Sequence, residues 1–267
     1  MKIRETGNVY KFDKDDYLIA DHSNVIIEDK WLNVLNDIID KYNKDHVHSI
    51  YVRGSVACNE AIDYVSDIDL IILFNEYPTN IFETYDDYHN YIISLQTYIT
   101  KEYPFVTKLD FGVPNYYKNI SDINKFIIKH QSVCIDGDNM QPSIEKRKKD
   151  LIPYQHQFLL RCLEQAKNEF PKANTLERNK LMKFISRIIL RSGFELVHTT
   201  IFTDIWTRDL YQCYRLFIKE YSYKKNRMLM TLKMALKPTN NSKDIKKIFH
   251  FGNWILDEIK IQNENRN

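Results

Sequence analysis

Two carboxylates and a glycine turn are the residues of this chain whose types and spacing could do chemistry. Asp67 and Asp69 open an apolar run that continues to Phe74, and the Gly54-Ser55 turn follows the preceding apolar run. A Gly-Ser turn can hold a phosphate against backbone amides, and paired carboxylates can bind a divalent metal. This combination indicates phosphoryl or nucleotidyl transfer.

The spacing of the two carboxylates itself favours a metal. Alternate side chains share one face of a strand, so Asp67 and Asp69 should point the same way, about 6–7 Å apart. At an effective dielectric near 20 their repulsion is roughly 2–3 kcal/mol, and a bound cation would turn it into attraction. The alternative interpretation is a solvated strand start, but the Gly54-Ser55 turn upstream favours the metal site.

Asp110 is the best candidate for a third carboxylate. In a strand predicted over Phe105–Val113, it shares a face with Lys108 and Gly112. It could be a metal ligand, a general base towards an attacking hydroxyl, or both. The alternative interpretation is an exposed strand carboxylate.

The elements that must position these residues follow from the pattern of apolar side chains. Trp31, Leu35 and Ile38 recur at helical spacing and predict a helix over 29–43. The run Ile68–Phe74 is apolar on both faces, which suits a central strand. The other predicted elements are a strand at 48–52, a short helix at 55–63, a helix at 82–102, a helix at 121–130 and a strand at 132–135.

A change in composition divides the chain. The segment Asp136–Ser143 is rich in residues typical of linkers, and helical periodicity dominates beyond it. We therefore predict an α/β domain over residues 1–140 and an all-helical domain over residues 141–267. The predicted helices of the second domain cover 144–169, 175–201, 206–221, 226–236 and 242–262.

Four basic residues share one face of the helix predicted at 175–201. Lys180, Lys183, Arg187 and Arg191 fall within about 80° at 3.6 residues per turn. Like charges at this spacing repel, so a polyanion is a natural neighbour, and Lys183 and Arg187 could hold a triphosphate. The alternative interpretation is a solvated charged face.

Composition narrows the location and the partners. The net charge of +2 over 267 residues argues against a nucleic-acid partner without excluding one. No apolar signal segment opens the chain and no window would span a bilayer, so we expect a cytoplasmic protein without a membrane partner. The cysteines show no close pairing that would indicate zinc or disulfides: Cys58, Cys134, Cys162 and Cys213.

The motif resembles the signature of the DNA polymerase β-like nucleotidyltransferase superfamily. That signature is Gly and Gly or Ser, about a dozen residues, then two aspartates separated by an apolar residue. Here it reads Arg53-Gly54-Ser55, eleven residues, then Asp67-Ile68-Asp69-Leu70, within residues 47–113. The chain is most similar to bacterial antibiotic nucleotidyltransferases of the aminoglycoside and lincosamide type.

The resemblance implies a mixed sheet and transfer of a nucleoside monophosphate from an NTP to a hydroxyl acceptor. Two Mg²⁺ ions would bind Asp67, Asp69 and Asp110, while Arg53, Gly54 and Ser55 would hold the triphosphate. Because members of this family commonly show these properties, the resemblance also suggests ATP as the donor, an aminoglycoside-like acceptor and a homodimer.

The sequence departs from relatives just after the turn, and other functions stay open. Cys58 and Asn59 stand where relatives often have a basic residue and a glycine. One alternative is a toxin-like enzyme that modifies a protein or tRNA. Another is a non-catalytic module that binds a nucleotide or a partner.

Overall fold

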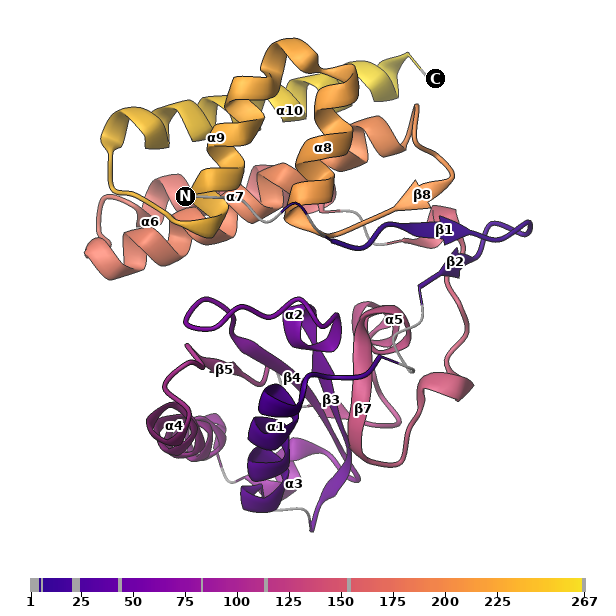
Figure 1. The fold of residues 1–267 in the computed structure, drawn as a ribbon, viewed down its shortest axis with the longest axis vertical. Helices are drawn as coiled ribbons and strands as arrows, with labels where there is room; N and C mark the ends of the chain where they lie inside the picture. Colours follow the sequence, from indigo (N-terminus) through magenta and orange to yellow (C-terminus); the bar gives the residue numbers. More distant parts are fainter. Residues whose placement is uncertain are drawn as a thin grey trace. The chain divides into compact units, whose positions relative to one another are not determined.

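The computed structural model shows two compact units (Figure 1). It describes residues 5, 7–20, 25–42, 45–82, 84–112, 115–152 and 155–265. The α/β unit is Asp13–Ile152, and the helical unit joins the described residues of Met1–Phe12 to those of Pro153–Asn267. The fold class predicted from the sequence, a mixed α/β sheet followed by a mostly helical region, is confirmed. The division into an α/β domain over residues 1–140 and a helical domain over residues 141–267 stays a prediction.

A mixed sheet forms the centre of the α/β unit. Its strands run in the order β5-β4-β3-β7, and β6 also pairs with β4. The β3 strand is antiparallel to β4 and to β7, whereas β4 is parallel to β5 and to β6. The strand bounds are β3 Val47–Arg53, β4 Ile68–Phe74, β5 Leu109–Asp110, β6 Asn115–Tyr116 and β7 Ser132–Gly137.

Alternation along β4 separates the core from the candidate site. One buried cluster joins Ile68, Leu70 and Ile72 of β4 to apolar residues of α1 (Asp29–Lys41) and α4 (Tyr85–Glu102). Asp69 lies between two of these core positions, so its side chain points to the opposite face of the sheet. Helix α5 contacts β3 and β7.

A cap fixes the start of helix α4, and the remaining elements of the α/β unit are short except for α5. Helix α4 begins with a capping box in which Thr84 and Asp87 each accept from the other's backbone amide. The Asp87 carboxylate is therefore committed to capping this helix. The other bounds are β2 Leu18–Ile19, α2 Gly54–Ala57, α3 Pro78–Ile81, α5 Asp122–Gln131, η1 Gln141–Ser143 and η2 Lys149–Leu151.

The helical unit is built around α7, which contacts the other long helices of the unit. A short antiparallel pair, β1 with β8, joins the start of the chain to this unit. None of the helices among the described residues is long and apolar enough to cross a membrane. The bounds are β1 Tyr10–Phe12, α6 His156–Glu169, α7 Thr175–His198, β8 Ile205–Trp206, α8 Leu210–Glu220, η3 Ser222–Lys224, α9 Lys225–Leu236 and α10 Ser242–Glu264.

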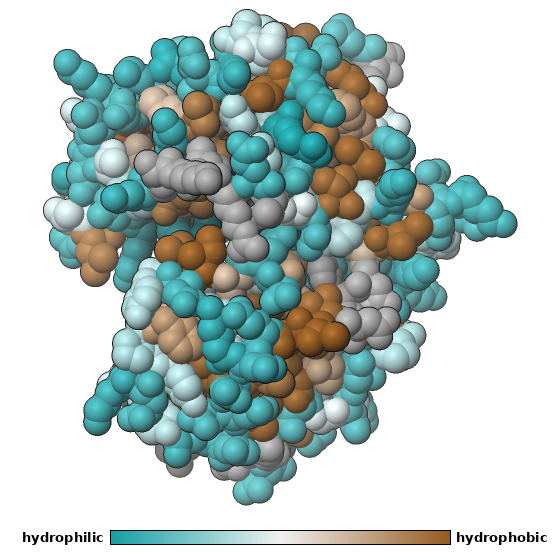
Figure 2. All heavy atoms as spheres, in the orientation of Figure 1, coloured by the Kyte–Doolittle hydropathy of each residue, from teal (hydrophilic) through white to brown (hydrophobic). Residues whose placement is uncertain are grey.

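Hydrophilic side chains cover most of the face drawn in Figure 2, with separate hydrophobic patches between them. The large apolar side chains are instead concentrated inside each unit. Trp31 and Phe74 are 1% exposed in the α/β unit, and Phe217 is fully buried in the helical unit. Each unit therefore has a hydrophobic core of its own.

Candidate active site

Strand register brings three sequence-distant residues of the candidate site together. Asp69 on β4 is the register partner of Arg53 on β3 and, on the other side, of Asp110 on β5. Neighbouring strands lie about 4.8 Å apart, so these three backbone positions form one row across the sheet. The Arg53 guanidinium pairs with the Asp69 carboxylate, with Nη2 and Oδ1 3.6 Å apart.

Gly54 lies directly against the Asp69 carboxylate. It follows β3 with a φ of +74°, which L side chains rarely adopt, and begins the short helix α2. A Cβ added to Gly54 would lie 2.7 Å from Asp69 Oδ2. Glycine is therefore required both by the backbone conformation and by the space beside Asp69. Ser55 follows in α2, where its carbonyl accepts from the Glu60 amide at 2.8 Å.

Asp110 is held by a backbone amide and a lysine. Its carboxylate accepts from Gly112 N–H at 3.1 Å and from the Lys108 ammonium at 3.2 Å. Burial would raise the pKa of the Asp110 carboxyl, but these two groups outweigh it. Together with the Arg53 charge, they hold that pKa below its ordinary value of 3.8. Asp110 is therefore ionised at neutral pH.

Asp67 lies just before β4 and is hydrogen-bonded to a residue that the sequence did not single out. Thr107 donates its hydroxyl to Asp67 Oδ1 at 2.5 Å and also to the Ser66 carbonyl at 2.9 Å. Within the described part of the strand predicted over 105–113, residues 105–112, only Leu109–Asp110 is a strand, so Thr107 lies in the loop before β5. Residue 113 lies outside the described residues. In an ideal strand Thr107 would lie on the face opposite Asp110. The sequence therefore did not indicate its contact with Asp67.

The departure from relatives at Cys58-Asn59 is partly a backbone effect. Asn59 has a φ of +54°, in the left-handed region where glycine is favoured and asparagine is the best-tolerated alternative. Asparagine at this position is therefore compatible with the turn. Cys58 is half-buried at the end of α2 and stands where the resemblance leads us to expect a basic residue.

The candidate ligands at this edge of the sheet are carboxylates, the type of side chain that binds a hard cation. Asp67, Asp69 and Asp110 supply only carboxylate oxygens, which Mg²⁺ prefers. Among the residues that the structure describes, no group of three or more His, Cys, Asp or Glu side chains is arranged to hold a metal ion. Two of the carboxylates are instead paired with Arg53 and Lys108.

The structure places Lys183 and Arg187 in the other compact unit. Both are half-buried on α7, and Arg187 Nε has no hydrogen-bond partner among the described residues. One turn further, Arg191 donates from Nε to the Arg208 carbonyl at 3.2 Å. Burial, with the Arg208 charge, lowers the pKa of Arg191 to about 9. The predicted face is thus exposed at Lys180 and partly buried further along the helix.

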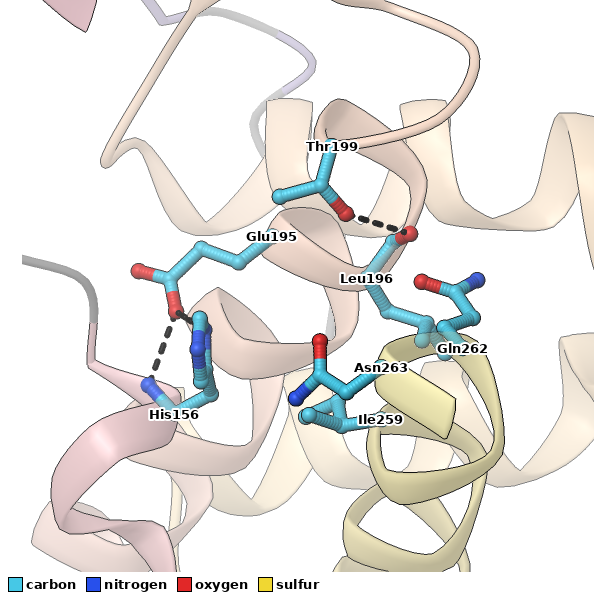
Figure 3. Close-up of a pocket in the computed structure, with 7 residues that line it drawn as sticks. All are labelled: His156, Glu195, Leu196, Thr199, Ile259, Gln262 and Asn263. Carbon is cyan, nitrogen blue, oxygen red and sulfur yellow. Dashed lines mark hydrogen bonds and ion pairs between the residues drawn. The ribbon is translucent and has the colours of Figure 1, made fainter. Parts of the chain in front are cut away.

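A cavity of about 200 Å³ lies within the helical unit. Figure 3 shows the Glu195 carboxylate of α7 turned towards His156 at the start of α6. Glu195 is 5% exposed, and its oxygens accept from the backbone amides of Gln155 and His156, each at 2.8 Å. The His156 ring adds a contact of 3.1 Å. The carboxylate therefore caps the first turn of α6.

Comparison with protein-family models identifies the part of the chain that carries the carboxylates. Residues 32–130 match the model described as "Nucleotidyltransferase domain". The match runs from within α1 to the next-to-last residue of α5 and contains Gly54, Asp67, Asp69 and Asp110. No curated protein matches the chain. The similarity therefore indicates nucleotidyl transfer as the reaction class and leaves the donor and the acceptor open.

Proposed function

We propose that this protein is a Mg²⁺-dependent nucleotidyltransferase that transfers AMP from ATP to a hydroxyl of a small, aminoglycoside-like acceptor. The observation that carries the proposal is the row formed by Arg53, Asp69 and Asp110, with Gly54 packed against Asp69. Strand register puts Arg53, Asp69 and Asp110 in one row, which supports a shared role towards one ligand. The nucleotidyltransferase domain match over residues 32–130 supports the reaction class.

Each residue of the candidate site has a role that its chemistry suits. Asp67, Asp69 and Asp110 would hold two Mg²⁺ ions, which neutralise the charge that develops on the phosphates. Arg53 and the Gly54-Ser55 turn would hold the triphosphate. Asp110, which is ionised at neutral pH, would also accept the proton of the attacking hydroxyl. The acceptor oxygen then bonds to the α-phosphorus, the bond to the β-phosphate oxygen breaks, and pyrophosphate leaves.

Lys183 and Arg187 on α7 are proposed as phosphate-binding residues. Arg187 Nε is buried without a hydrogen-bond partner among the described residues, which suits a cation kept for an external anion. Lys183→Ala and Arg187→Ala should weaken NTP binding without changing the affinity of the α/β unit for Mg²⁺. We also propose a homodimer, on the basis of the family resemblance alone.

One specific observation favours a second candidate, a non-catalytic nucleotide-binding or partner-binding module. Arg53 and Lys108 pair with Asp69 and Asp110, so internal cations already neutralise two of the three carboxylates. In a chain that had lost Mg²⁺ binding, such pairs would keep the site stable. A toxin-like enzyme acting on a protein or tRNA differs from the first proposal only in its acceptor.

Transfer from α-labelled ATP to a panel of acceptors tests the proposal. The panel should include aminoglycosides, a protein extract and tRNA, with pyrophosphate release as the second readout. We expect Mg²⁺-dependent label transfer that Asp69→Asn abolishes and Asp86→Asn, at an exposed aspartate of α4, preserves. Mg²⁺-dependent ATP binding without transfer to any acceptor would instead support the non-catalytic module.

A further inference from the structure

Two aromatic rings of the helical unit contact a lysine ammonium, and a third ring packs beside them. Tyr221 directly follows α8, Tyr223 lies in η3, and Trp254 lies on α10. We call Tyr221, Tyr223 and Trp254 the aromatic cage. Lys224 Nζ is 4.4 Å from the Trp254 ring centroid and 5.4 Å from that of Tyr223. Both distances are in the range of a cation–π contact.

The rings of the cage are set at steep angles to one another. The Trp254 centroid is 5.4 Å from that of Tyr221 and 6.3 Å from that of Tyr223, with interplanar angles of 79° and 84°. The two tyrosine rings are 6.1 Å apart and tilted by 55°. Rings at such angles can present faces on more than one side of a compact cation.

Packing behind the cage holds two of its rings in place. Phe251 stacks on Trp254 at 5.6 Å, and Phe217 stacks on Tyr221 at 5.1 Å. Phe217 is fully buried and Phe251 is 2% exposed, so the Tyr221 and Trp254 rings both pack against buried core residues. Tyr223 is 70% exposed, which leaves the cage open to solvent on that side. The cage is therefore both supported and accessible.

A negative charge lies beside the cage. After burial, the Glu258 carboxylate is the main cause that raises the pKa of the Tyr221 and Tyr223 hydroxyls. Glu258 follows Trp254 by one helical turn, so it lies on the same face of α10. A nearby carboxylate favours a cation and disfavours an anion at the same place.

We propose that the aromatic cage is a binding site for a small organic cation, above all a quaternary ammonium, and that Lys224 occupies it when no ligand is present. The Lys224 contacts show that the rings accept an ammonium group. A primary ammonium is strongly hydrated, whereas a quaternary ammonium gives up less hydration when it enters an aromatic site. The ligand therefore replaces Lys224 and leaves its ammonium to water. This site belongs to the helical unit alone and does not depend on nucleotidyl transfer.

Tryptophan fluorescence during titration with tetramethylammonium chloride tests the cage directly. Trp31 and Trp206 are 1% and 3% exposed, so Trp254 is the residue that reports on an added cation. Sodium chloride at equal concentration controls for ionic strength. We expect saturable quenching, with a dissociation constant that falls about fivefold or more in Lys224→Ala, equivalent to about 1 kcal/mol.

Two matched variants separate the cage from a general effect of charge. Lys225→Ala removes the neighbouring, exposed lysine and should leave the dissociation constant unchanged. Tyr223→Leu removes an exposed ring without disturbing the core and should weaken binding. Equal gains in Lys224→Ala and Lys225→Ala, or quenching without saturation in both the wild type and Lys224→Ala, would overturn the proposal.

Discussion

Gly54→Ala tests whether the glycine turn positions the Asp69 carboxylate. The variant forces alanine to adopt a φ of +74°, which costs about 1–2 kcal/mol of folding free energy. It also places a Cβ 2.7 Å from Asp69 Oδ2, closer than real Cβ contacts allow. The carboxylate must therefore turn away from its place beside Arg53. A shift of about 1 Å in a reacting group can cost about 100-fold in rate.

Gly112→Ala is a matched control for the backbone cost. Gly112 also has a positive φ, +57°, but an added Cβ would meet only the Leu70 carbonyl at 4.0 Å. Both variants should lose about 1–2 kcal/mol of stability in denaturant unfolding. Their effects on the site should differ, because Gly54→Ala displaces the Asp69 carboxylate, whereas Gly112→Ala keeps the backbone amide from which Asp110 accepts.

Calorimetric titration with MgATP separates the backbone cost of alanine from the displacement of the Asp69 carboxylate. We expect the affinity to fall by about tenfold or more in Gly54→Ala, about 1.4 kcal/mol, and to stay within about twofold of the wild type in Gly112→Ala. Near-normal affinity in Gly54→Ala, or equal losses in the two variants, would refute the role given to Gly54.

Three further predictions concern the carboxylates. Asp69→Asn should reduce transfer roughly 100-fold or more, yet change the free energy of unfolding by less than about 1 kcal/mol, because its pair with Arg53 is one-third exposed; near-normal turnover would contradict its role as a ligand. Asp110 has a lowered pKa, so its ionised form should stabilise the fold above about pH 3.8, an effect lost as the pH falls through the folded pKa. In Lys108→Ala, carboxyl NMR titration should show this pKa rising, and an unchanged value would mean that Lys108 does not hold Asp110. Glu195→Ala should destabilise the helical unit by about 1–3 kcal/mol because two α6 amides lose their acceptor; exposed Glu164→Ala is the control, and equal stability in both would refute the cap.

The positions of the central strands and of most helices could be predicted from periodicity. The predicted strand Ile68–Phe74 is confirmed at both ends, and the helix predicted at 226–236 is observed one residue longer, as Lys225–Leu236. Burial on both faces of β4 and apolar spacing on α9 make these patterns unambiguous. The register of β4 with β5 pairs Asp69 with Asp110, and their shared role as metal ligands stays a prediction.

Local backbone geometry limited the remaining predictions. The helix predicted at 55–63 ends at Ala57, since Asn59 adopts a positive φ that a helix cannot include. The helix predicted from residue 144 begins only at His156. Ile152 is extended there because it precedes a proline in the sequence. Side-chain pairs such as Thr107 with Asp67 depend on loop conformation, which hydrophobic periodicity does not encode.

Thermal unfolding of the wild type and Asp67→Asn, with each of the four NTPs in the presence and absence of Mg²⁺, tests the central claim most directly. A ligand that binds only the native state raises the melting midpoint by mass action. We predict a Mg²⁺-dependent rise with ATP in the wild type that is lost in Asp67→Asn. No rise with any NTP, or an equal rise in both proteins, would contradict the assignment of this sheet edge as a metal–nucleotide site.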